Sequence, residues 1–140
     1  MAWVVDTCLV LDVLDDDPAF GEAAARCIEG HQPDGLTICP VTLIELAPAF
    51  LGDWRRAEEF LTQLGVDYQA DWISADTHAA FAAWHRHIER KRAGQSARRP
   101  VADIQIGAFA VRHQGLLTRN AGDFKRWFPS LKVAGPGKNT

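Results

Sequence analysis

Apolar residues along the chain fall into short runs, and these alternate with longer segments in which apolar positions recur every three or four residues. The short runs are rich in valine, isoleucine and leucine, which is typical of strands buried on both faces of a parallel sheet. The longer segments have the spacing of amphipathic helices. The pattern predicts strands at 3–5, 36–39, 66–68, 116–118 and 131–133, and helices at 8–14, 19–30, 42–48 or 42–52, 54–64, 75–93, 101–113 and 124–128.

Strands that alternate with helices predict an α/β fold: one domain over residues 1–140, with a mostly parallel central sheet flanked by helices. The 140 residues are 47% hydrophobic, which is enough for a real core. No apolar run is long enough to span a membrane, and we see no secretory signal. The three cysteines, Cys8, Cys27 and Cys39, lie among apolar neighbours, which favours reduced thiols. We therefore expect a cytoplasmic protein without a membrane partner.

Carboxylates follow the places where the predicted strands end. Asp6 ends the first strand, and Glu45 lies in the first turn of the helix after the second. Asp103 opens the helix 101–113, and Asp123 comes one short turn after the fourth strand. In open parallel sheets the ligand lies outside the carboxyl ends of the strands. Three or four acids at that edge are suited to one or two Mg²⁺ or Mn²⁺ ions, which activate water and neutralise charge on phosphorus.

Each acid also has a structural interpretation. Asp6 and Asp123 could be N-caps, Thr42-x-x-Glu45 has the spacing of a capping box, and Asp103 would be stabilised by the dipole of its helix. Four anions at one edge nevertheless repel one another unless a cation lies among them. This repulsion favours a metal site over four separate structural roles.

Charge is distributed unevenly. Residues 1–76 hold 15 acids and 3 bases, and residues 77–140 hold 3 acids and 12 bases, so the halves carry −12 and +9. Such asymmetry points to a polyanion or an acidic partner, although solvated helix faces could also produce it. We expect Arg98, Arg99 and Arg119 near the acids, where guanidinium groups would bind phosphate or a partner's carboxylate.

Four segments together resemble the PIN-domain family. They are Val4-Val5-Asp6-Thr7, the isolated Glu45, Pro100-x-x-Asp103-Ile104, and Leu117-Thr118-Arg119-Asn120-x-x-Asp123-Phe124. The length and the opening of the chain resemble the VapC-type toxin branch of that family. The resemblance covers nearly the whole chain, and the last motif is its most specific part. Ala108 and Phe109 depart from the small residues usual in the branch, which concerns helix packing and not the acids.

The resemblance implies a magnesium- or manganese-dependent endoribonuclease, usually a homodimer, that a cognate antitoxin holds inactive. By position, Asp6, Glu45 and Asp103 match the core catalytic and metal-binding acids, and Asp123 matches a more variable fourth. Supporting polar groups would come from Thr7, Thr118 and Asn120. The Arg98, Arg99 and Arg119 side chains would contact RNA or the antitoxin, and the apolar helices between residues 9 and 28 would offer the antitoxin a groove.

Two rival functions stay open: a DNA-directed nuclease, and a catalytically silent PIN-like module that binds RNA or protein. Other enzyme classes fit less well. The sequence has no glycine-rich loop followed by lysine, as a P-loop requires, and no H-E-x-x-H zinc motif.

Overall fold

A computed structural model describes residues 1–91 and 100–137 of the chain. Its centre is a five-stranded sheet in the order β3-β2-β1-β4-β5, with every neighbouring pair of strands parallel. The elements are β1 (Trp3–Val5), α1 (Thr7–Leu14), α2 (Gly21–His31), η1 (Gln32–Asp34), β2 (Leu36–Thr37), α3 (Pro40–Glu45), η2 (Ala47–Phe50), α4 (Trp54–Leu64), β3 (Val66–Asp67), α5 (Ser74–Lys91), α6 (Val101–Val111), β4 (Gly115–Leu117), α7 (Ala121–Trp127) and β5 (Val133–Ala134). The predicted α/β architecture with a parallel sheet and flanking helices is confirmed.

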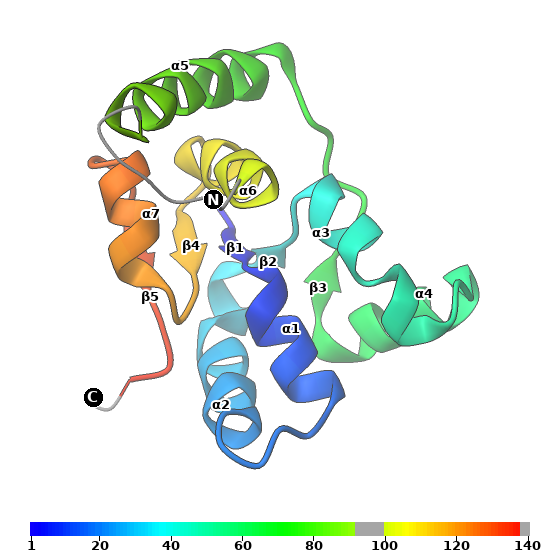
Figure 1. Cartoon of the computed structure of the whole chain (residues 1–140). Coiled ribbons are helices and arrows are strands. Elements are labelled where there is room, and N and C mark those ends of the chain that lie inside the picture. Colours follow the sequence, from blue (N-terminus) through cyan, green and yellow to red (C-terminus); the bar gives the residue numbers. More distant parts are fainter. Residues whose placement is uncertain (92–99, 138–140) are drawn as a thin grey trace.

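Helices cover both faces of the sheet, so each face has its own hydrophobic core (Figure 1). Because side chains alternate along a strand, Trp3 and Val5 enter the core beneath α1, α2 and α4, whereas Val4 enters the core beneath α5, α6 and α7. Figure 1 shows α6 between α5 and the strands, and in β4 Leu116 and Leu117 divide between the cores in the same way. Burial on both faces explains why the strands are short, continuous apolar runs.

The strand order reverses at β1. From β1 the chain crosses to β2 and β3 on one side, and β4 and β5 lie on the other. Adjacent parallel strands whose connections leave in opposite directions open a crevice at their carboxyl ends, and this switch point is the usual ligand site in such sheets. Here β1 and β4 are those strands, with Val5 opposite Leu117.

Local sequence signals set several element ends. The Asp53 side chain accepts a hydrogen bond from the Arg56 backbone N–H at 3.2 Å, which confirms it as the N-cap of α4. Gly65, with φ of 79°, ends the same helix in the left-handed conformation that glycine tolerates. The helix α3 begins at Pro40 and not at the predicted Thr42, because proline's fixed φ suits the first helical turn.

The last strand differs from the prediction of 131–133. Leu131 is 3% exposed and fills the core beneath α7, where its backbone N–H donates to the Phe128 carbonyl at 2.9 Å. That turn delays strand pairing until β5, which begins at Val133. Across the described ranges, no helix combines the length and the apolar character needed to cross a membrane.

The departure noted at Phe109 has a packing explanation. Gly107 leaves room for the Phe128 ring, with which a Cβ at that position would clash. Phe109 is fully buried on the other side of α6, with its ring parallel to that of Trp72 at 6.4 Å between centroids. The large side chain therefore fills the core under α5 and does not alter the edge of the sheet where the acids lie.

Candidate active site

Asp6 and Thr118 span the switch point. Each is the first residue after its strand, and the Asp6 backbone N–H donates to the Leu117 carbonyl at 2.9 Å. The Thr118 hydroxyl then donates to Asp6 Oδ2 at 2.7 Å. Asp6 is 3% exposed and Thr118 is 1% exposed. Asp6 does occupy the N-cap position of α1, but its side chain makes no capping hydrogen bond and turns to Thr118 instead.

Glu45 is joined to the residue next to Asp6. Thr7 Oγ1 lies 2.7 Å from Glu45 Oε1 and 2.9 Å from the hydroxyl oxygen of Thr42. A carboxylate only accepts hydrogen bonds, so Thr7 gives its single proton to Glu45 and receives one from Thr42. Thr42 lies inside α3 and Cys39 is its N-cap residue, so the proposed capping box is wrong. Glu45 is the last residue of α3, and it is exposed.

Asp103 lies in the first turn of α6, where it is half-buried. The helix ends at Val111 and is followed closely by the start of β4, so its last turn lies at the amino end of the sheet and its first turn at the carboxyl end. One contact supports this placement of the first turn of α6: the Cys39 thiol, just beyond the carboxyl end of β2, lies 4.0 Å from the Gln105 carbonyl oxygen. The fold therefore directs Asp103 towards the edge that holds Asp6.

Asp123 lies within the first turn of α7, and Asn120 occupies the N-cap position. The alternative that Asp123 caps this helix is therefore wrong. Asn120 contributes its backbone, whose N–H donates to Thr118 Oγ1 at 2.9 Å and fixes the start of α7 beside the switch point. The Asp123 side chain is 46% exposed, and its carboxylate lies 3.4 Å from the Arg126 guanidinium.

Burial dominates the electrostatics of Asp6. It raises the pKa of that carboxyl above its ordinary value of 3.8, hydrogen bonds from Thr118 and Cys8 oppose the increase, and the nearby charge of Glu45 adds to it. Cys8 donates its S–H to Asp6 Oδ2 at 3.3 Å. Burial and the Asp6 charge raise the pKa of this thiol to about 12, so it is a neutral donor at physiological pH.

The predicted binding arginines have different positions. Arg119 makes two bonds to the buried Asp12 carboxylate, at 2.8 and 2.9 Å, and its guanidinium carbon lies 4.1 Å from the centre of the Phe20 ring. These contacts join α1 to the turn after β4, so Arg119 is held beside the site by an internal ion pair. Arg98 and Arg99 lie outside the described residues.

No three His, Cys, Asp or Glu side chains within residues 1–91 and 100–137 are grouped closely enough to hold a metal ion. The donors still suit a hard divalent cation, because Asp6 is a buried carboxylate that no Lys or Arg of these ranges contacts. Glu45 lies near enough for its charge to raise the pKa of Asp6. Anions placed so are stabilised when a cation enters between them.

Sequence reasoning missed two buried aspartates and one thiol. Asp12 and Asp76 are 5% and 1% exposed, and each is paired with an arginine. Asp12 stands inside the apolar run 8–14, and a charge in such a run is a signal that could have been used. The role of Cys8 left no signal beyond its position two residues after Asp6.

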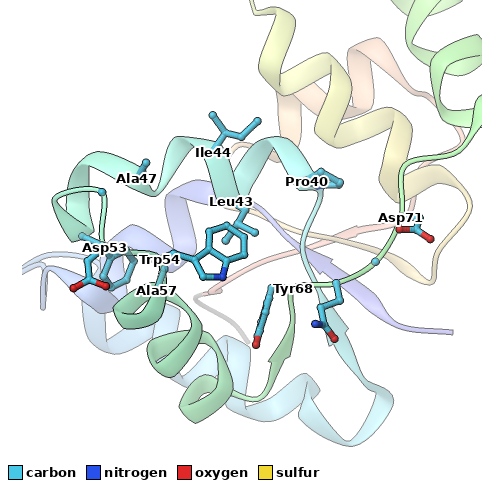
Figure 2. A pocket seen from close by; sticks show the side chains of 13 residues that line it. Pro40, Leu43, Ile44, Ala47, Asp53, Trp54, Ala57, Tyr68 and Asp71 are labelled. Carbon is cyan, nitrogen blue, oxygen red and sulfur yellow. The ribbon is translucent and has the colours of Figure 1, made fainter.

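A hollow of about 620 Å³ does lie within the segment between residues 9 and 28, and three acids, Asp16, Asp17 and Glu22, are among the residues that line it. The large apolar side chains of those helices belong to the core. Leu9, Val10 and Ile28 are at most 1% exposed. A second hollow, of about 570 Å³ and lined mainly by apolar residues, lies between α3, α4 and the segment that follows β3. Figure 2 shows the Trp54 indole and the Tyr68 ring inside it, with Asp53 and Asp71 at its two ends.

Comparisons with known proteins agree with this geometry. The model of the PIN domain matches residues 3–127. Among solved structures, the chain is similar to one described as VapBC2 from Rickettsia felis bound to a DNA fragment from their promoter, with a TM-score of 0.69 and 17% identity over 96% of this chain and 98% of that one. No curated protein matches at a significant level. Because the family model spans most of the chain, and the parallel sheet with Asp6 and Thr118 at its switch point agrees with it, the protein belongs to the PIN-domain family.

Proposed function

We propose that the protein is a divalent-metal-dependent endoribonuclease of the VapC toxin type, with its site at the carboxyl ends of β1 and β4. One observation carries the proposal: Asp6 is a buried carboxylate at the switch point, close to the charge of Glu45, and no Lys or Arg in the described ranges neutralises it. A buried anion of this kind is costly unless a cation binds it. The family and the similar VapBC2 structure support the choice of a nuclease.

Asp6, Glu45 and Asp103 would hold the ion, and Asp123 would complete the set. Bound there, Mg²⁺ or Mn²⁺ would activate water and neutralise charge that develops on a phosphodiester. The protein contributes the position of these acids. Thr118 fixes Asp6 from β4, and Thr7 fixes Glu45 from the first turn of α1. Since both threonines adjoin the ends of central strands, the carboxylates are held by rigid elements.

The direct test is cleavage of RNA and of DNA of the same sequence by the purified protein, with Mg²⁺ and with a chelator. The proposal expects cleavage of RNA alone, abolished by the chelator and restored by added Mg²⁺. Cutting that continues in chelator would reject the metal mechanism. Cleavage of DNA instead would favour the DNA-directed rival, and binding of RNA without cleavage would favour the silent module.

Substitution of individual acids can then show whether each one acts in catalysis or only in folding. Asp103→Asn keeps the shape of the side chain and hydrogen-bonding groups but removes the charge, so it should lose most of the cleavage rate with little change in melting temperature. Asp123→Asn, at a more exposed position, should have a smaller effect than Asp103→Asn on the cleavage rate and on the melting temperature. Parental cleavage by Asp103→Asn would remove that residue from the site.

The proposed antitoxin partner requires a surface close to the site. The hollow between α3 and α4 is such a surface, because Ile44 lines it and adjoins Glu45 on α3. Ile44 is 71% exposed and Trp54 is 58% exposed, so the two bring exposed apolar surface to the same hollow. We propose that it receives an apolar antitoxin segment whose basic residues face Asp53 and Asp71.

Co-expression with the neighbouring open reading frame should therefore relieve toxicity in the parent. Ile44→Ser should weaken the complex and restore toxicity, whereas Phe81→Ser, which removes an exposed apolar side chain from α5, serves as the matched control. Equal relief in both variants would exclude the hollow. Dimer formation and the cytoplasmic location remain predictions from the sequence.

A further inference from the structure

Two donors hold the same oxygen of Asp6. The Thr118 hydroxyl reaches Oδ2 at 2.7 Å, and the Cys8 thiol reaches the same atom at 3.3 Å. Within the described ranges no side chain donates to Oδ1. With Oδ2 held by side chains from two directions, and the Thr7 backbone N–H also interacting with the carboxylate, the plane of the carboxylate is fixed, and Oδ1 is the oxygen that no side chain of these ranges occupies.

Cys8 belongs to a face of α1 that lies against the turn after β4. Cys8 and Asp12 are four residues apart, so they project from the same side of the helix. Asp12 binds the Arg119 guanidinium, and the backbone N–H of Arg119 interacts with the Cys8 sulfur. The thiol is therefore held between the turn that carries Thr118 and the carboxylate of Asp6. Its contacts with the Arg119 backbone and with Asp6 point the S–H towards Oδ2.

We infer that Cys8 is a positioning residue, which works with Thr118 to keep Asp6 Oδ2 occupied so that Asp6 presents Oδ1 alone to the catalytic cation. The inference rests on the proposed function for its consequence in catalysis. Groups that orient a metal ligand in this way commonly contribute about 10- to 100-fold in metal affinity or activity. The thiol is the weaker of the two donors, so we expect the lower end of that range.

The experiment compares Cys8→Ala and Cys8→Ser with the parent, using the rise in melting temperature on adding Mg²⁺ and the rate of RNA cleavage. Cys8→Ala should bind Mg²⁺ about tenfold more weakly and cut RNA about tenfold more slowly. Cys8→Ser keeps a hydrogen-bond donor, so it should recover most of the Mg²⁺ affinity and most of the cleavage rate. Cys27→Ala removes a buried thiol from α2, away from the site, so it should lower the melting temperature but leave the Mg²⁺ response intact.

A measurement on the metal-free protein separates this inference from the proposed function. Crystal structures of the metal-free protein compare the orientation of the Asp6 carboxylate, whose plane should turn in Cys8→Ala and return to the parental orientation in Cys8→Ser, because one of the two side-chain donors to Oδ2 has been lost and replaced. If the parent neither binds Mg²⁺ nor cuts RNA, the proposed function fails, and this orientation alone decides the role of Cys8. An unchanged orientation in Cys8→Ala, or a Mg²⁺ response of Cys8→Ala equal to that of a parent that does bind, overturns the inference.

Discussion

Three aspartates are buried in the described part of the chain, and they differ in the groups that contact them. Asp12 and Asp76 each receive two hydrogen bonds from one arginine, Arg119 and Arg112, at 2.8–2.9 Å. Asp6 receives a hydroxyl and a thiol, both neutral, and has the charge of Glu45 nearby. The arginine pairs satisfy their carboxylates within the chain, whereas the Asp6 surroundings leave a negative charge that a cation from outside can complete.

The contrast distinguishes two carboxylates that are paired with arginines inside the fold from the one proposed to bind a cation. Arg112 joins the connection before α5 to α6, and Arg119 joins α1 to the turn after β4. Both pairs lie between elements that must be held together. Asp6 lies at the switch point of the sheet, where burial disfavours its charged form.

The largest expected effect is on catalysis by Asp6→Asn. The substitution keeps a hydrogen-bond acceptor for Thr118 and removes the charge that would hold the ion, so the rate of RNA cleavage should fall about 100-fold or more. The melting temperature without metal should be unchanged or higher, because an unpaired buried charge is gone. Rates from a single-turnover assay, with Asp12→Asn as the matched variant, check this. A rate within threefold of the parent would place the chemistry elsewhere.

The second effect is on stability. Arg112→Ala leaves the Asp76 carboxylate buried without its guanidinium, and we expect a loss of about 3 kcal/mol in the free energy of unfolding. The lower end of the usual range applies, because the Arg112 side chain is 32% exposed. Urea denaturation measures the loss. If the variant is as stable as the parent, the ion pair is not what satisfies Asp76, and the contrast with Asp6 loses its basis.

Thr118→Val should lower both the stability of the protein and its rate of RNA cleavage by a moderate amount. It removes the donor to Asp6 Oδ2 and the acceptor for the Asn120 N–H, so unfolding should become easier by about 2 kcal/mol and cleavage about tenfold slower. Thr37→Val is the control. Among residues 1–91 and 100–137 its hydroxyl bonds only to the Asp67 carbonyl, at 3.0 Å, and the loss of this bond should cost about 1 kcal/mol. Equal cleavage by the two variants would show that Thr118 has no role beyond folding.

The smallest effect is a pH dependence of stability. The pKa of Asp6 is raised in the folded state, so the folded protein holds this proton at pH values where the unfolded chain has released it. Stability from this group is therefore present at low pH and is lost as pH rises from 3.8 through the folded pKa. Asp6→Asn should lack that decrease. Thermal unfolding between pH 4 and 8 measures the difference, and parallel curves for parent and variant would contradict it.

The architecture could be predicted from the sequence because its signals are local. Continuous apolar runs, helical spacing and a capping aspartate at position 53 predicted most elements, and the acids at strand ends follow from parallel topology. The assignment of Arg119 to ligand binding missed its pairing with Asp12, 107 residues away. Thr42 has the spacing of a capping box, but its hydroxyl instead bonds to Thr7 on α1. Partners this distant are set by packing, which no local pattern records.

The most direct test of the Asp6 site is the change in melting temperature on adding Mg²⁺ at neutral pH, measured for the parent, Asp6→Asn and Asp12→Asn. A cation that binds the folded site and barely the unfolded chain stabilises by mass action, by about 2.7 kcal/mol at 100 times its dissociation constant. The melting temperature should rise clearly for the parent and for Asp12→Asn, which starts from a lower melting temperature, and should hardly rise for Asp6→Asn. A full rise in Asp6→Asn would contradict the site at its centre.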